Sequence, residues 1–493
     1  MPSLALAPER STATIERTAP SLADWLGRRL LSPVSIAPLA AFRIVFSLLL
    51  LRWSVWVYFD HGLIETRYVQ PAFLFSYYGF EWVRPWAGIG MHLHFAALGL
   101  LAFCVGIGFS YRLSATLLFL GLAYVFLLDQ ALYSHQSYLI CLVSFLMILI
   151  PAHRAVSIDG WLRPDVRSPT VPAWCLWALR LQLGLPYFFS GLTKVQADWL
   201  GGEPLRFWLR QRTDVPLIGR WLTEEWFVRL ASWGALSFDL LILPALIWRR
   251  TRTLAIVVAV VFNLISSRWF DLGLLSWLMI AGAALFLPAS WFELIMSRDR
   301  KLSSEFRLPP STFRLRVVVA VLGIYTLLQV LVPLRYWLYP GTFIWTLEGL
   351  RFSWSMRTTE RRGELSYVIT DPASGESWRV DPADELSRTQ LRKVELMPDL
   401  ILQYAHHLAD RYSVPGHQRV QVRAISSISV NCRPLQTFID PEVDLAAQPR
   451  SLWPARWIAP FESNRFQDVV GDGGCHGCHG QRSAAESAVL PMG

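Results

Sequence analysis

Long apolar runs recur along most of the chain, and they restrict its fold more than any other feature. A helix needs about 20 predominantly apolar residues to cross a bilayer, and 53% of this chain is hydrophobic. The runs long enough to span lie at about 35–59, 91–110, 113–132, 137–153, 173–195, 230–248, 253–271, 274–293 and 316–337. They predict a polytopic α-helical membrane bundle of about nine spans, with the lipid bilayer as its surroundings.

The arginines predict how this bundle is oriented. They cluster after even-numbered runs or before odd-numbered ones, at Arg28, Arg29, Arg112, Arg154, Arg163, Arg167, Arg249, Arg250, Arg252, Arg298, Arg300 and Arg307. Because cytoplasmic loops carry the excess of Lys and Arg, we expect a cytoplasmic N-terminus and an extracytoplasmic segment after residue 337. Arginines within 195–229 fall on the opposite side, so we interpret that stretch as re-entrant or interfacial.

The net charge of +9 is explained by these loop arginines. Since no basic run is interleaved with aromatic residues, we expect no nucleic-acid partner. The N-terminal segment lacks a short apolar stretch followed by small residues, so no removable signal peptide is expected. The first span is then the insertion signal.

After residue 337 the pattern becomes that of a small α+β domain. Residues 363–380 alternate apolar and polar side chains around Asp-Pro-Ala-Ser-Gly, which predicts a β-hairpin. Residues 398–410 have helical periodicity with an acidic first turn, and 420–430 alternate again. We therefore divide the chain into a cytoplasmic segment (1–34), a transmembrane domain (35–337), an extracytoplasmic α+β domain (338–440) and a loosely ordered tail (441–493).

One lysine, Lys194, ends an otherwise apolar and aromatic span, where a charge is costly. Arg180, Tyr187 and Lys194 are spaced seven apart and fall on nearly one stripe of the helix. Gly184 and Gly191 repeat the interval and would let a neighbouring helix or a ligand approach closely. The stripe predicts a site inside the bundle.

Each residue of this stripe also has an ordinary structural explanation. Lys194 could reach the interface and pair with Asp198, one turn further on. Arg180 and Tyr187 could simply hydrogen-bond neighbouring helices. Asp129 and Asp239 lie within apolar runs and predict structural ion pairs, with Arg43 and Arg52 as candidate partners.

Four separated stretches carry a resemblance to a known family. They are Ala37-Pro-Leu-Ala-Ala-Phe-Arg43, Phe126-Leu-Leu-Asp-Gln-Ala-Leu-Tyr-Ser-His-Gln-Ser-Tyr-Leu139, Gly191-Leu-Thr-Lys-Val-Gln-Ala-Asp-Trp199, and Leu334-Arg-Tyr-Trp-Leu-Tyr-Pro-Gly341 with Trp345-Thr-Leu-Glu-Gly-Leu-Arg-Phe-Ser-Trp354. In these the chain resembles the vitamin K-dependent γ-carboxylases and their bacterial relatives, which share the HTTM membrane domain. The resemblance places the chain in a bacterial inner membrane.

The resemblance implies a chemistry for Lys194, which matches the family's basic lysine. In the family a neutral lysine deprotonates reduced vitamin K, here a menaquinol-type quinol. Reaction with dioxygen gives an alkoxide that removes a γ-proton from a peptide glutamate, and the carbanion adds carbon dioxide. A secreted or periplasmic peptide is then the protein substrate, and burial is what makes the amine neutral.

The chain departs from the family at several positions near that lysine. Where relatives have Asn-His-x-Tyr-Leu, this chain has His135-Gln136-Ser137-Tyr138-Leu139. A His and an Asn four apart in relatives correspond to Asn263 and Ser266, and a Phe-Pro pair is replaced by Leu275-Ser276. We expect Arg180, Tyr187, His135, Gln136 and Asn263 to line the quinone or substrate site, although His135 could equally be an ordinary interfacial histidine.

The tail contains Cys475-His-Gly-Cys478-His479, the attachment signature of c-type haem. A disulfide or a metal clasp formed by Cys475, Cys478 and the histidines explains the same residues.

The sequence thus supports three functions. One is a γ-carboxylase-like enzyme, the second a quinone-linked redox protein with a haem or thiol tail, and the third a non-catalytic HTTM-fold binding protein.

Overall fold

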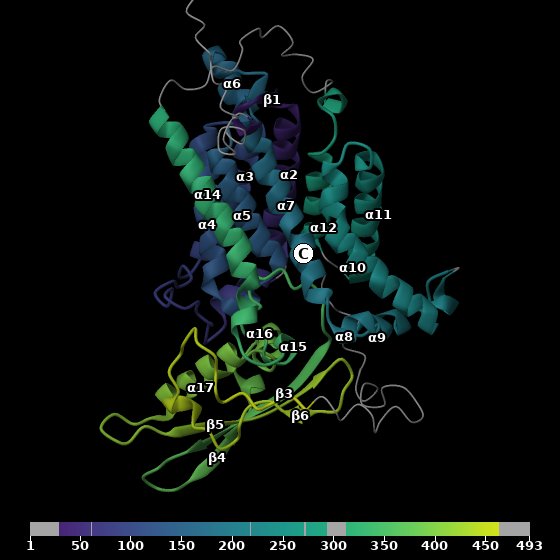
Figure 1. Cartoon of the computed structure of the whole chain (residues 1–493). Helices are drawn as coiled ribbons and strands as arrows, with labels where there is room; N and C mark the ends of the chain where they lie inside the picture. The colour runs from purple at the N-terminus through teal and green to yellow at the C-terminus, as the bar shows by residue number, and fades with distance from the viewer. Residues whose placement is uncertain (1–28, 61, 217, 271–272, 293–311, 463–493) are drawn as a thin grey trace, which may run out of the picture.

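The computed structural model describes residues 29–60, 62–216, 218–270, 273–292 and 312–462. The Cys475–His479 motif and most of the predicted tail therefore lie outside the described residues. The described chain forms a helical bundle with a small sheet domain at one end (Figure 1).

Nine helices make up the described part of the bundle: α2 (Ala37–Phe59), α3 (Gly90–Ile107), α4 (Tyr111–Leu128), α5 (His135–Leu149), α7 (Ala173–Lys194), α10 (Glu225–Ile247), α11 (Arg252–Phe270), α12 (Leu274–Ala284) and α14 (Thr312–Leu334). Within the described residues, six helices are long and apolar enough to cross a membrane. Helices α5 and α12 are shorter apolar helices, and α7 carries Arg180 within it and Lys194 at its end. The protein is an integral membrane protein, but the predicted count of nine spans is not confirmed.

Local sequence explains where several helices begin and end. Pro38 lies in the first turn of α2, where its fixed φ suits the helix. α5 begins with a capping box between Ser134 and Ser137. α3 ends at Gly108, which has a positive φ of 66° and lies so close to Ser157 that an added Cβ would be 2.4 Å from the Ser157 Cβ.

Short elements cover both ends of the bundle. At the end far from the sheet domain, β1 (Pro33–Ser35) pairs antiparallel with β2 (Thr170–Pro172), and α6 (Ile158–Leu162) lies beside them. At the sheet-domain end, α8 (Ala197–Leu200) and α9 (Leu205–Arg210) extend sideways (Figure 1). Both helices lie within residues 195–229, the stretch that the sequence predicts to be re-entrant or interfacial.

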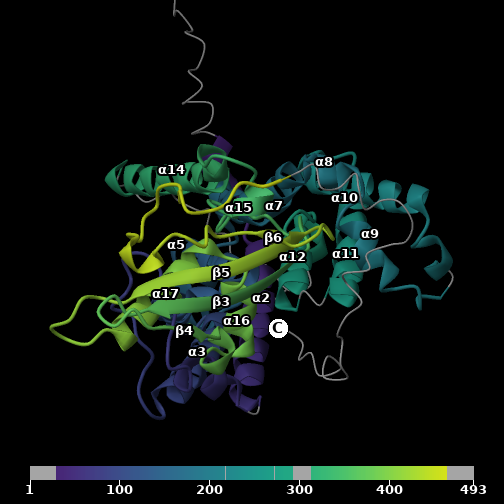
Figure 2. The ribbon, with the colours of Figure 1, turned by 90° about the horizontal axis from the view of Figure 1, so that it is seen from below.

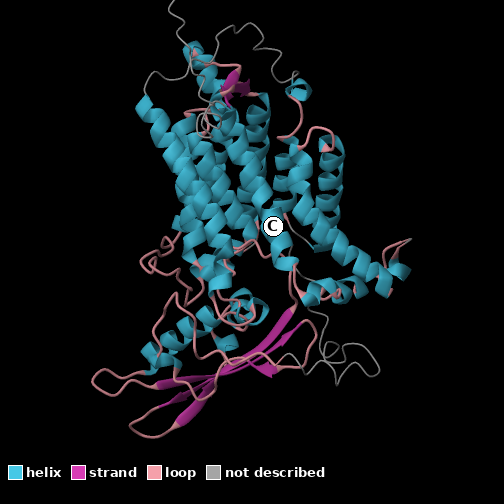
Figure 3. Ribbon diagram, viewed as in Figure 1, coloured by secondary structure: helices cyan, strands magenta, loops and turns pink. Residues whose placement is uncertain are grey.

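The sheet domain consists of one antiparallel sheet in the order β4-β3-β5-β6, with helices on its bundle side (Figures 2 and 3). Its strands are β3 (Arg361–Thr370), β4 (Ser377–Val380), β5 (Gln421–Val430) and β6 (Gln436–Thr437), and its helices are α15 (Phe343–Thr346), α16 (Arg388–Val394) and α17 (Pro398–Tyr412). The predicted hairpin, helix and second strand correspond to β3–β4, α17 and β5.

One apolar core contains buried side chains from both the sheet domain and the bundle. Phe75 and Ala131, from bundle loops, are buried in the apolar cluster formed by Tyr367, Tyr404 and Phe438 of the sheet domain. The sheet domain therefore closes the end of the bundle at which Lys194 lies.

Candidate active site

Glycines on α7 bring α10 close to the lysine. A Cβ on Gly184 would lie 2.5 Å from Leu243 Cδ1, and one on Gly191 would lie 2.8 Å from Leu240 Cδ2. Small residues of this kind let helix backbones approach within a membrane. The close approach predicted for these glycines is made by α10, and it brings Asp239 against the last turn of α7.

Lys194 and Asp239 form a buried ion pair. The Lys194 Nζ donates to an Asp239 carboxylate oxygen and, at 2.8 Å, to Ser190 Oγ. The two side chains are 8% and 4% exposed. The Lys194 ammonium also lies over the Trp199 ring, 5.1 Å from its centroid. Lys194 is therefore enclosed by protein and does not reach outward to pair with Asp198.

This pair forms part of the wall of a cavity of about 1730 Å³. Ligand pockets in proteins usually measure about 300–1,000 Å³, so the cavity can hold two ligands of moderate size. Apolar and aromatic side chains line its bundle half, among them Trp199, Trp208, Phe262, Trp269 and Phe270. A flat apolar ring system fits such a lining.

Four of the five residues expected beside Lys194 line the same cavity. Asn263 donates to the Tyr187 hydroxyl at 2.6 Å, so the two form one polar contact within an aromatic wall. His135 Nε2 donates to the Ser355 carbonyl at 3.0 Å, while its Nδ1 lies 3.2 Å from the Tyr133 hydroxyl. Gln136 accepts a hydrogen bond from the Leu275 backbone at 2.9 Å.

Arg180 is not among the described residues that line the cavity. It donates to the Leu285 carbonyl at 2.8 Å and lies over the rings of Trp177 and Phe286. Fourteen residues of helix separate it from Lys194, about 21 Å along the axis. Sharing a stripe with Lys194 therefore does not bring Arg180 into the site.

Both intramembrane aspartates have partners other than the predicted Arg43 and Arg52. Asp239 pairs with Lys194, and Asp129 accepts from the backbone of Ala131 and from Gln390. Arg43 instead donates to backbone carbonyls, including that of Ala152 at 2.6 Å. An arginine in an apolar region can donate to backbone carbonyls in place of a carboxylate, so its presence did not identify the partner of an aspartate.

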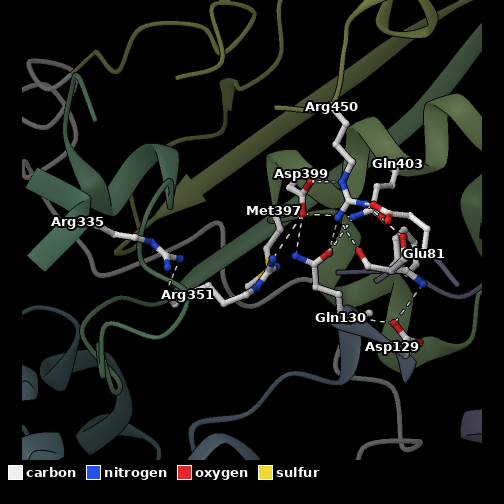
Figure 4. A network of polar contacts seen from close by, with 12 residues as sticks. Glu81, Asp129, Gln130, Arg335, Arg351, Met397, Asp399, Gln403 and Arg450 are labelled. Carbon is white, nitrogen blue, oxygen red and sulfur yellow. Dashed lines mark hydrogen bonds and ion pairs between the residues drawn. The ribbon is translucent and has the colours of Figure 1, made fainter. Parts of the chain in front are cut away.

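The sheet-domain half of the cavity is rich in cations that the sequence did not single out. Its lining includes Arg335, Arg351, Arg357, Lys393, Arg450 and Arg456, against the carboxylates of Glu348 and Asp399. Figure 4 shows the contacts that Asp399 makes with two of these cations, Arg450 and Arg351. Its carboxylate lies 3.2 Å from Arg450 Nε and 3.4 Å from an Arg351 nitrogen, and it accepts from Gln130 at 2.8 Å.

Lys393 differs from those arginines. In the described part of the chain no hydrogen bond or ion pair is found for its ammonium, although it lines the cavity. Burial, and then the charges of Arg351, Arg392 and Arg357, lower the pKa of Lys393 below its ordinary value. Among the described residues, the sheet-domain half of the cavity thus has a cation without an ion-pair partner.

The fold and the site define an integral membrane protein with a buried lysine at a cavity between a helical bundle and a sheet domain. The HTTM domain family matches residues 31–291, more than half of the chain, and the lumenal domain family of vitamin K-dependent gamma-carboxylase matches residues 314–464. The protein belongs to the HTTM-domain family of vitamin K-dependent gamma-carboxylases. No solved structure matches the chain significantly.

Proposed function

We propose that this protein is a membrane enzyme that couples oxygenation of a reduced quinone to carboxylation of a peptide glutamate. The observation that carries this is the position of Lys194, buried in the wall of a large cavity whose nearby lining is aromatic. Intramembrane ionisable groups are functional sites by default. Together with dioxygen and carbon dioxide, a bound quinol supplies the base strength needed to remove a glutamate γ-proton and lets the carbon be carboxylated.

The position of each residue in the cavity indicates its role in this reaction. Lys194 accepts the hydroxyl proton of the quinol as a general base. The aromatic wall holds the ring system, and Tyr187 with Asn263 offers polar atoms to a ring oxygen. Closure of the bundle end by the sheet domain keeps water from the reacting atoms.

The cations of the sheet-domain half favour a substrate with a carboxylate. Lys393 is free in the described structure, and the arginines near it outnumber the acids. A glutamate side chain entering from the sheet domain would meet these cations before it reached the bundle half. This arrangement supports an acidic peptide as the second ligand.

The arginine loops support an extracytoplasmic sheet domain. Arg112, Arg154, Arg163 and Arg252 lie at helix ends on the side of the bundle away from the sheet domain. If that side is cytoplasmic, as the bias of positive loops favours, the sheet domain faces outward. A secreted or periplasmic peptide could then reach the cavity.

The test compares purified Lys194→Ala with wild type. We expect quinone epoxide formation to fall by about 10²–10⁴-fold, the usual contribution of a general base. Carboxylation of a co-expressed glutamate peptide, seen as a mass gain of about 44 Da, should be lost with it. Arg180→Gln is the matched control, since it removes another cation from α7 that is not among the residues lining the cavity.

Two results would contradict the proposal. Absence of epoxide formation by the wild-type protein with any menaquinol-type quinol would favour a non-catalytic binding protein of this fold. Epoxide formation equal in wild type and Lys194→Ala would remove the lysine from the chemistry.

A further inference from the structure

The ion pair of Lys194 raises a chemical difficulty for its role as a base. An ammonium that donates to a carboxylate has no free electron pair and cannot accept another proton. Lys194 makes such a contact with Asp239 and also donates to Ser190 Oγ at 2.8 Å. In this contact Lys194 can therefore accept a proton from the quinol only if it gives one of its own protons to another group.

The surroundings favour transfer of a proton within the pair. Both side chains are buried, and both Lys194 and Asp239 line the cavity. In a medium of low polarity, a pair of neutral groups competes with a pair of ions. The hydrogen bond between the Nζ and the carboxylate provides a direct path for the proton.

We propose that Asp239 is a positioning residue that receives a proton from Lys194 as the lysine takes one from the quinol. This inference rests on the proposed function. The O–H bond of the quinol breaks and an N–H bond forms on Lys194, while another N–H bond of Lys194 breaks and an O–H bond forms on Asp239. The electron pair of the quinol O–H bond stays on its oxygen, and no electrons leave the site.

The relay leaves the net charge of the buried site unchanged. Before the step the Lys194 ammonium is balanced by the Asp239 carboxylate, and after it the same ammonium is balanced by the oxygen that lost its proton. No uncompensated charge is created in the membrane, which would be costly. The ammonium also lies where it stabilises the new negative charge.

The first experiment measures the lysine without any turnover. The sequence contains three lysines, Lys194, Lys301 and Lys393, so labelling by phenyl isothiocyanate, which reacts with neutral amines, can be mapped by mass spectrometry. In Asp239→Asn we expect labelling of Lys194 to rise several-fold while labelling of Lys393 stays constant. Asp410→Asn, the matched control, also removes a carboxylate from an ion pair but should leave both unchanged, because Asp410 pairs with Arg419 at an exposed position and neither residue lines the cavity.

The second experiment measures quinol epoxidation. Asp239→Asn should lower it by about 10²-fold and should change the pH profile, whereas Asp239→Glu should restore part of both. In wild type, a single-turnover rate measured in mixtures of H₂O and D₂O should give a curved plot, since two protons move. This last measurement needs no variant and holds even if Asp239→Asn fails to fold.

The outcomes separate the relay from the proposed function. Epoxidation that is lost in Lys194→Ala but kept in Asp239→Asn overturns the relay alone, as does unchanged labelling of Lys194 or a linear isotope plot. Epoxidation that is the same in wild type and Lys194→Ala overturns the proposed function itself. A rise in Lys194 labelling in Asp239→Asn would then show that the ion pair exists, but not that it relays a proton.

Discussion

Lys393 is the residue that reports most directly on the second ligand of the cavity. A carboxylate binds the protonated form of this lysine, and its pKa lies below the ordinary value for lysine, about 10.4. As pH rises through that lowered pKa, the ammonium is lost. We therefore expect the KM for a glutamate peptide to rise with pH in wild type, at a lower pH than an ordinary lysine would give.

Lys393→Gln should raise this KM about 10-fold at neutral pH, the value of one charged hydrogen bond, and should remove the dependence on pH. Lys393→Arg should keep tight binding at high pH because its charge is not lost. Arg388→Gln is the control, since Arg388 begins the same helix, is exposed, and is neither among the lining residues nor among the charges that lower the pKa of Lys393. The KM is measured by steady-state kinetics with the peptide varied at saturating quinol. Identical pH profiles of KM for wild type and Lys393→Gln would contradict the proposal that Lys393 binds the peptide carboxylate.

At the level of residues, the sequence could identify the lysine but not its partner. Lys194 is conspicuous because a charge at the end of an apolar helix is costly. Asp239 is equally costly, yet its partner depends on which helix packs against α10 and at what height. That register is a tertiary property, and the stripe of Arg180, Tyr187 and Lys194 contains no information about it.

At the level of elements, the contact between α7 and α10 sets the distance between the lysine and the aspartate. In Gly191→Ala the new Cβ would lie 2.8 Å from Leu240 Cδ2 and 3.1 Å from Asp239 Cβ. We expect the helices to separate slightly, with a loss of about 1–3 kcal/mol in stability. Thermal unfolding in detergent would measure the loss, and labelling of Lys194 should increase as Asp239 moves away.

Gly234→Ala is the matched control for this substitution. Gly234 lies on α10 as well, but nothing is found within 4 Å of an added Cβ. Alanine is the better helix former by up to about 1 kcal/mol, so the control should be neutral or stabilising. Equal destabilisation by both substitutions would mean that the close approach of the helices at Gly191 is not the cause of the stability loss.

Most helices were predictable because a long apolar run leaves few alternatives. The runs at 35–59 and 173–195 correspond closely to α2 and α7. The number of spans was not predictable in the same way. The run at 274–293 gives a helix that ends at Ala284, shorter than a bilayer requires, and a run of apolar residues does not show where the chain turns.

At the level of the whole molecule, the sheet domain must stay docked for the cavity to have its second half. Asp198, just after α7, accepts hydrogen bonds from Arg433 at 2.6 and 2.8 Å and from Asn431 at 2.7 Å. Arg433 and Asn431 follow β5, so these contacts join the bundle to the sheet domain. Gln130 and Arg450 make a second connection at Asp399.

The docking contact at Asp198 should make the assembly sensitive to acid. Burial alone would raise the pKa of Asp198, but the hydrogen bonds from Arg433 and Asn431 outweigh it and hold the pKa below its usual value. A carboxyl with a lowered folded pKa stabilises the fold above its unfolded pKa of about 3.9, and that stabilisation is lost as pH falls through the folded value. The contact is therefore complete at neutral pH and fails only in strong acid.

Asp198→Ala should remove this contribution at neutral pH, at a cost of about 2 kcal/mol, and should flatten the acid side of the stability curve. Asp410→Ala is the control, because Asp410 pairs with Arg419 within the sheet domain and its side chain is 74% exposed. It should cost far less, as exposed ion pairs do. Thermal unfolding in detergent between about pH 3 and pH 7 measures both, together with protease sensitivity of the sheet domain. If Asp198→Ala and Asp410→Ala lose equal stability and the protease cuts both equally, the link at Asp198 does not hold the two halves of the cavity together.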